Sequence, residues 1–168
     1  HDALPICLST DGFSFSIYNP IHDDSLSIIE KEIDTSLSLT ANLKAVFHES
    51  DFLNHPYKRV NIMMASKRFT IAPLDLFEEG QAELLFYHNH QKRENETVLY
   101  NILRKNNVAV IFGIDKSAQT FLNEQYPEAR FYSQSTPFID YFSVKSRLGN
   151  SKKMYASIRK DGIDIYCF

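Results

Sequence analysis

The 168-residue sequence has no tryptophan, two cysteines, five glycines and no long hydrophobic run. Cys7 and Cys167 lie in apolar, strand-like segments, where a reduced cysteine acts as a small hydrophobic residue, so a disulfide framework is not indicated. No run approaches the roughly 20 apolar residues of a membrane helix. Residues 1–5 lack the charged and apolar regions of a signal peptide. We therefore expect a cytoplasmic protein without a membrane span.

The charged residues are interspersed and nearly balanced. The sequence holds 21 acidic and 18 basic residues, for a formal net charge of -3, and the basic residues form only short clusters such as Lys58-Arg59. Because a nucleic acid requires a longer basic surface to neutralise its phosphates, we expect no nucleic-acid partner. Apolar residues make up 43% of the chain, with 13 Phe and 9 Tyr, which is typical of a packed, strand-rich globular protein.

Predicted strands and helices alternate along the chain. Apolar and polar residues alternate in 6–8 and 13–17 around Asp11-Gly12, a dipeptide that supplies the positive φ angles of a tight β-hairpin. Residues 26–33 fit a strand or a short helix, and we favour a third antiparallel strand. Further strands are predicted at 60–65, 69–71, 97–103, 108–114 and 130–133, and helices at 37–53, 76–88, 117–125 and 136–148. This mixture predicts an α/β fold with a mixed sheet.

Single residues refine these predictions. Thr40 is available as a cap for the first helix, and Gly80 weakens the beginning of the second. Pro137 and Gly149 can start and stop the last helix. The apolar runs 60–65 and 108–114 are typical of strands that are buried on both faces.

The first and last segments of the chain share one pattern. Aligning Asp11-Gly12 on Asp161-Gly162 superposes two strand–turn–strand units at a constant offset of 150 residues. The superposed apolar pairs are Leu8 with Ile158, Phe13 with Ile163, Phe15 with Ile165 and Ile17 with Cys167. A hairpin, a third antiparallel strand and alternating helices and strands describe a ribonuclease-H-like lobe, whose duplication gives the actin-like ATPase architecture. We therefore expect residues 1–149 to form a first ribonuclease-H-like lobe and residues 150–168 the opening β-hairpin of a second, truncated lobe.

Three stretches of the chain resemble a known family. They are Tyr57–Phe77, Leu8–Phe15 and the Tyr126-Pro-Glu-Ala-Arg-Phe131 segment. Together they resemble an uncharacterised bacterial domain-of-unknown-function family that has been placed in the actin-like ATPase superfamily, and the resemblance covers nearly the whole chain. The resemblance implies a fold and leaves the activity open, because that family has no established function.

In actin-like ATPases the first hairpin carries an Asp, a Gly and a small hydroxyl residue, so that backbone amides meet phosphate and the carboxylate orients hydrated magnesium. The nearest positions here are Asp11, Gly12 and Ser14 in the first hairpin and Asp161 and Gly162 in the second. Each Asp directly precedes its Gly, which suits a turn residue better than a metal-orienting carboxylate on a strand. The second hairpin also lacks a run of Gly or Ser to expose several amides. We expect no catalytic residue and no bound cofactor in this chain.

Two functional hypotheses follow from these observations. The first is a non-catalytic, actin-like scaffold or protein-interaction module that binds an unknown protein partner or forms a homodimer through an open sheet edge or the second hairpin. The alternative is an actin-like protein that binds or hydrolyses ATP with magnesium, at a site between the lobes that is incomplete in this chain. The alternative predicts that Asp11 and Asp161 face each other across a cleft.

Metal-dependent chemistry has little support in the sequence. A two-metal nuclease of this fold needs carboxylates that converge from different strands, and Asp11, Glu30, Asp34 and Asp115 would do so only by coincidence. The spacing of His88-Asn-His90 could present two imidazoles on one face of a strand. We interpret this segment as the end of a helix with solvated polar residues, and we expect no metal ligand.

Overall fold

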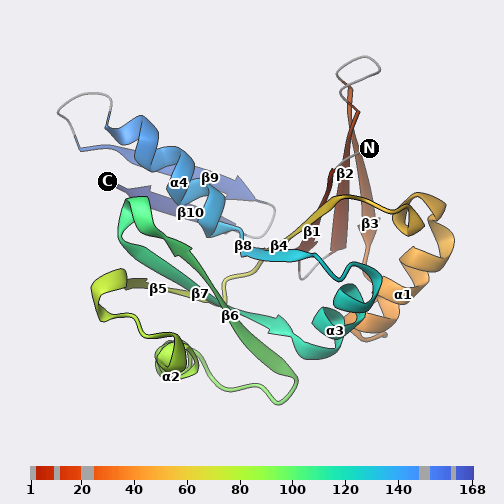
Figure 1. Cartoon of the computed structure of the whole chain (residues 1–168), viewed down its shortest axis with the longest axis horizontal. Coiled ribbons are helices and arrows are strands. Elements are labelled where there is room, and N and C mark those ends of the chain that lie inside the picture. The colour runs from red at the N-terminus through yellow and green to blue at the C-terminus, as the bar shows by residue number, and fades with distance from the viewer. Residues whose placement is uncertain (1–2, 10–11, 20–24, 148–151, 160–161) are drawn as a thin grey trace.

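The computed structural model describes residues 3–9, 12–19, 25–147, 152–159 and 162–168 (Figure 1). Strands and helices alternate along the described residues, which confirms the mixed α/β class. The elements are β1 (Ala3–Ser9), β2 (Gly12–Asn19), β3 (Ser25–Glu32), α1 (Leu39–Glu49), η1 (Asp51–Asn54), β4 (Arg59–Ala65), β5 (Phe69–Pro73), η2 (Leu74–Leu76), η3 (Glu79–Gln81), α2 (Ala82–Asn89), β6 (Glu96–Leu103), η4 (Arg104–Asn106), β7 (Val108–Asp115), α3 (Lys116–Gln125), β8 (Arg130–Ser133), α4 (Ser135–Ser146), β9 (Met154–Arg159) and β10 (Gly162–Cys167).

The larger sheet has five strands in the order β3-β2-β1-β4-β8. The neighbours β1–β2 and β2–β3 are antiparallel, whereas β1–β4 and β4–β8 are parallel. Alternate side chains of a strand point to opposite faces, and Leu4, Ile6 and Leu8 of β1 point into the main core. That core also contains Leu43 of α1 and Leu122 of α3, so these two helices cover this face of the sheet.

A smaller antiparallel sheet with the order β5-β7-β6 lies between β4 and α3 in the sequence. Its central strand β7 is buried at six consecutive positions, 109–114. The two faces of β7 enter different clusters, because Ile111 packs with Phe86 of α2 while Val110 packs with Ile139 of α4. Burial on both faces confirms the prediction for 108–114.

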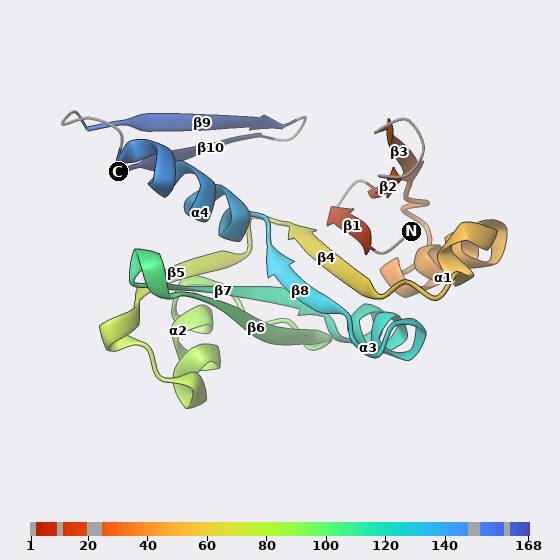
Figure 2. The ribbon, with the colours of Figure 1, turned by 45° about the horizontal axis from the view of Figure 1, so that its top comes forward.

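The last two strands form a separate antiparallel ribbon that lies on α4, as Figure 2 shows. Tyr166 of β10 is 8% exposed and packs against Phe138 and Phe142 of α4, with ring centroids 5.8 and 5.6 Å away. The Gln134 amide at the start of α4 also donates a hydrogen bond to the Asp164 carboxylate, at 3.2 Å. The second predicted hairpin is therefore present, and it is held to the rest of the chain by aromatic contacts along one helix.

The two hairpins pair with the same register. Leu8 pairs with Phe13 in the first hairpin, and the residues 150 positions later, Ile158 and Ile163, pair in the second. The same holds for Ile6–Phe15 and Ala156–Ile165, and for Cys7–Ser14 and Ser157–Asp164. The correspondence predicted from the sequence therefore extends to the backbone pairing.

The helix boundaries differ from the predictions at several points. The first helix is capped by the Ser38 side chain, which accepts a hydrogen bond from the Ala41 amide at 3.1 Å, so the choice of Thr40 was wrong. Residues 37–53 divide into α1 and the short turn η1. The second helix begins at Ala82 and not at residue 76, and Gly80 lies in the short helix η3 before it.

Two further details concern the last helix and strand β4. The last helix begins at Ser135, which places Pro137 at its third position, where an amide has no partner inside the helix; the predicted stop, Gly149, lies outside the described residues. Strand β4 buries only Val60, Ile62 and Met64, so it is fully buried on one face and not on both.

Candidate functional site

The predicted phosphate positions are only partly within the described residues. Asp11 and Asp161 lie outside them, and their predicted meeting across a cleft stays a prediction. Gly12 begins β2 and pairs with Glu32 of β3, whereas Gly162 begins β10 and pairs with Arg159 of β9 in the second hairpin. Ser14 lies inside β2, pairs with Cys7, and is half-buried.

A pocket of about 400 Å³ opens at the carboxyl ends of the parallel strands β1 and β4, and we call it the edge pocket. Leu8 and Ser9 contribute to it from β1, and Met64, Ala65 and Ser66 from the end of β4. Ligands of open α/β sheets bind beside the carboxyl ends of the strands. The edge pocket therefore occupies the position where a ligand of this fold is expected.

A partly buried ion pair forms one wall of the edge pocket. The Arg68 Nε and Nη2 donate to the two carboxylate oxygens of Glu96, at 2.8 and 2.7 Å, and Nη2 also donates to the Gln91 carbonyl at 2.9 Å. The Arg68 and Glu96 side chains are only 17% and 5% exposed. The hydrogen bonds to Glu96 raise the pKa of Arg68 above its ordinary value, so the guanidinium stays charged. The Arg68 guanidinium also lies over the Phe86 ring, 5.4 Å from its centroid.

Gly113 of β7 makes room for this pair. A Cβ at this position would lie 2.4 Å from Glu96 Oε1 and 2.8 Å from its carboxyl carbon. Any larger residue would therefore push the Glu96 carboxylate away from its present place. The Gly113 amide also donates to the Arg68 carbonyl at 3.3 Å, which ties β7 to the loop after β4.

The second carboxylate of the edge pocket, Asp115, caps helix α3. Its Oδ1 accepts a hydrogen bond from the Ala118 amide at 2.8 Å, and its Oδ2 accepts one from the Asn95 side chain at 2.8 Å. Of the four charged residues that line the edge pocket, Arg68, Glu96 and Asp115 are thus bound to partners within the chain, and the fourth, Arg93, is exposed. A phosphate that bound to Nε and Nη2 of Arg68 would have to displace the Glu96 carboxylate.

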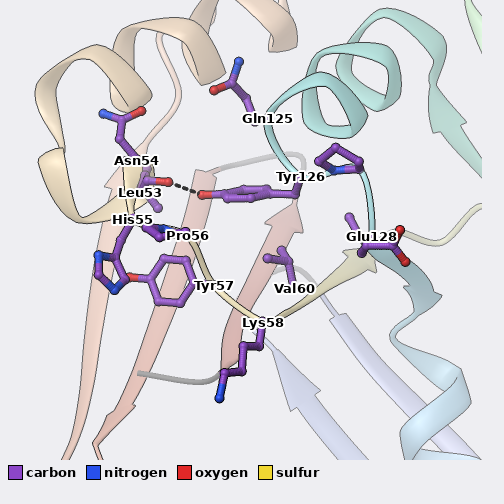
Figure 3. Close-up of a pocket in the computed structure, with 12 residues that line it drawn as sticks. Leu53, Asn54, His55, Pro56, Tyr57, Lys58, Val60, Gln125, Tyr126 and Glu128 are labelled. Atoms are coloured by element: carbon purple, nitrogen blue, oxygen red, sulfur yellow. Dashed lines mark hydrogen bonds between the residues drawn. The ribbon is translucent and has the colours of Figure 1, made fainter.

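A second pocket, of about 390 Å³, lies at the opposite end of β4, before the start of β8 (Figure 3). The Tyr126 hydroxyl donates to the Leu53 carbonyl, and the Tyr57 hydroxyl donates to the Phe52 carbonyl at 2.9 Å. Burial raises the pKa of Tyr126 well above its ordinary value. These two hydroxyls therefore tie turn η1 to the ends of the sheet, which is a structural use of both.

The candidate metal ligand Asp34 serves local structure. Asp34 accepts hydrogen bonds from the Ser36 amide and hydroxyl, at 2.9 and 2.6 Å, in a turn, and these bonds lower the pKa of Asp34. His88 lies in the last turn of α2 and His90 follows it, which confirms the prediction of a helix end. Across the described ranges, no group of three or more His, Cys, Asp or Glu side chains could hold a metal ion.

The edge pocket had no signal in the sequence. Arg68 and Glu96 are 28 positions apart and lie on different elements, so no local spacing connects them.

None of the helices in the described part of the chain has the length and apolar character to cross a membrane.

The whole chain, residues 1–168, matches a family described as "Protein of unknown function (DUF3822)". The chain belongs to this family. A solved structure from Bacteroides thetaiotaomicron VPI-5482, described as a protein with actin-like ATPase fold and unknown function, shares 80% sequence identity and a TM-score of 0.90, and the match covers 99% of this chain and 65% of that one. This DUF3822 chain therefore spans just under two thirds of that relative. The expected family and the actin-like fold are both confirmed.

A more distant structure shows the same fold. The "PilM-PilN type IV pilus biogenesis complex" is 10% identical with a TM-score of 0.50, and the match covers 99% of this DUF3822 chain and 58% of that one. No curated protein matches the chain.

Proposed function

We propose that this DUF3822 chain is part of a non-catalytic, actin-like scaffold that binds another protein. The observation that carries the proposal is the state of Arg68, the partly buried cation of the edge pocket. Its guanidinium is bound through two nitrogens to Glu96, and charge-assisted pairs of this geometry are strong. A nucleotide phosphate that bound to these two nitrogens would have to break the pair and leave a buried carboxylate without its partner, which is costly.

The proposal includes two lobes. Residues 1–149 form the first ribonuclease-H-like lobe, and residues 150–168 open the second. The identical pairing register of the two hairpins supports this division. So does the separation of the ribbon from the five-stranded sheet.

The partner in this proposal is a protein. The distant structure with the same fold is described as a complex of two named pilus biogenesis proteins, so the fold can serve assembly. For this chain the partner is a second copy or another protein, and the place of action is the cytoplasm.

A calorimetric titration tests the proposal: ATP and magnesium are added to the full-length family protein and the heat of binding is measured. We expect no binding heat up to about 1 mM nucleotide. Uptake with micromolar affinity, abolished by Arg68→Gln, would refute the scaffold and establish the alternative, an ATP-binding actin-like protein. The Arg104→Gln variant is the matched control, because Arg104 is an exposed arginine that does not line the edge pocket.

A further inference from the structure

The ribbon formed by β9 and β10 presents one face that none of the described elements covers (Figure 2). We call it the outer face. It consists of Met154, Ala156, Ile158, Ile163, Ile165 and Cys167, which alternate with the residues that face α4. Four of these side chains are large and strongly exposed: Met154 at 71%, Ile158 at 78%, Ile163 at 62% and Ile165 at 61%.

The outer face lacks the composition of a surface that meets water. An antiparallel sheet with one wet side alternates apolar and polar residues, with the polar ones outward. Here the polar residues Ser157 and Asp164 lie on the inner face with Tyr155 and Tyr166. Contiguous exposed apolar surface of this kind marks an interface, and a ribbon of two strands is only marginally stable without a further layer.

The internal repeat identifies what should cover the outer face. At the offset of 150 residues, Met154, Ala156 and Ile158 correspond to Leu4, Ile6 and Leu8 of β1. Those three side chains are 0%, 1% and 0% exposed, because the helices α1 and α3 pack over them. The two ribbons thus share the register and the apolar face, and only the first has its helices in the described structure.

We propose that amphipathic helices of the same polypeptide, equivalent to α1 and α3, cover the outer face in the full-length family protein. This inference rests on the two-lobe arrangement proposed above. The relative from Bacteroides thetaiotaomicron has the length to supply such helices, because just over a third of its chain has no counterpart here. The helices that cover the first ribbon have only 11 and 10 residues.

Substitution of matched isoleucines in the full-length family protein tests this inference. Ile158→Thr on β9 and Ile28→Thr on β3 change the same side chain on strands where it is 78% and 59% exposed, and threonine keeps the β-branched shape. We expect Ile158→Thr to lower the melting temperature by about 4–12 °C, since it would place a hydroxyl beneath a helix layer. Ile28→Thr should lower it by less than about 2 °C. Equal shifts for the two variants would overturn the proposal.

Alkylation of Cys167 gives a second readout in the unsubstituted protein. The thiol is exposed in the described structure, so a helix layer should slow its reaction with iodoacetamide by at least about tenfold relative to the urea-unfolded protein. Reaction at the unfolded rate would overturn the proposal.

Light scattering tests whether a second copy of the protein, instead of helices of the same polypeptide, covers the outer face. A dimer that Ile158→Thr converts to a monomer would assign the face to a second copy and overturn the proposal. A monomer that keeps the melting-temperature difference supports it. Neither readout involves nucleotide, so a failure here is distinct from a failure of the scaffold proposal in the ATP titration.

Discussion

Replacing Glu96 by glutamine removes the charge that holds Arg68 in the edge pocket while it keeps the size of the side chain. The Arg68 guanidinium would keep its bond to the Gln91 carbonyl and its contact with the Phe86 ring. The guanidinium would lose the Glu96 carboxylate, whose two oxygens accept hydrogen bonds from its Nε and Nη2. The substitution therefore tests the pair on which the proposed function depends.

The burial of the pair sets the size of the effect. Breaking a buried ion pair by removing one partner costs about 3–5 kcal/mol, whereas exposed pairs contribute about 0–1 kcal/mol. Because Arg68 retains 17% exposure and a remaining hydrogen bond, we expect a loss of about 3 kcal/mol in the free energy of unfolding. In a chain of this length that loss lowers the melting temperature by about 6–12 °C.

Urea unfolding followed by circular dichroism measures this loss, with Glu94→Gln as the exposed control. The double variant Arg68→Met/Glu96→Gln should be more stable than the sum of the two single losses, because neither charge is then left unpaired. If Glu96→Gln costs under about 1 kcal/mol, as expected for a surface pair, the reasoning that Glu96 holds Arg68 in the edge pocket is refuted.

Three further predictions concern single residues. Gly113→Ala should cost about 1–3 kcal/mol of unfolding free energy in urea, because its Cβ would lie 2.4 Å from Glu96 Oε1; the same cost in a Glu96→Ala background would contradict this cause. Tyr126→Phe should lose about 1 kcal/mol near neutral pH with its hydrogen bond. Burial raises the pKa of Tyr126 in the folded chain above 10.0, so its hydroxyl ionises in the unfolded chain at a lower pH than in the folded one. The free energy of unfolding of the wild type should therefore fall above pH 10 more steeply than that of Tyr126→Phe. Parallel pH profiles of the two proteins in urea titrations would exclude this effect. Asp115→Ala should cost about 1 kcal/mol by removing the cap of α3, whereas Asp115→Asn should cost less; equal losses in urea would rule out capping as the cause.

Local patterns predicted most of the elements, because their causes are local. The Asp-Gly dipeptides predicted both hairpins, and the apolar run at 108–114 predicted the buried strand β7. Helix starts were less accurate. Ser38 and Thr40 are both acceptable N-caps in a sequence, and the structure begins α1 at Leu39, which makes Ser38 the cap.

The candidate site could not be derived in the same way. The sequence suggested positions in and beside the hairpin turns, among them Ser14 in the predicted strand 13–17, and the structure places Ser14 inside β2 as predicted. The edge pocket depends on Arg68, Glu96 and Gly113, and these residues meet only because β5 and β6 both pair with β7. Contacts of this kind follow from the sheet topology, for which single-sequence patterns carry no signal.

The common register of the two hairpins limits how related sequences can change in length. Neighbouring side chains on a strand point in opposite directions, so one residue inserted within β9 would turn the following aliphatic side chains toward α4 and the tyrosine side chain outward. A residue inserted between Arg159 and Gly162 would leave the alternation in both strands intact. Insertions and deletions among homologues should therefore concentrate between the two strands and spare 154–159 and 162–167.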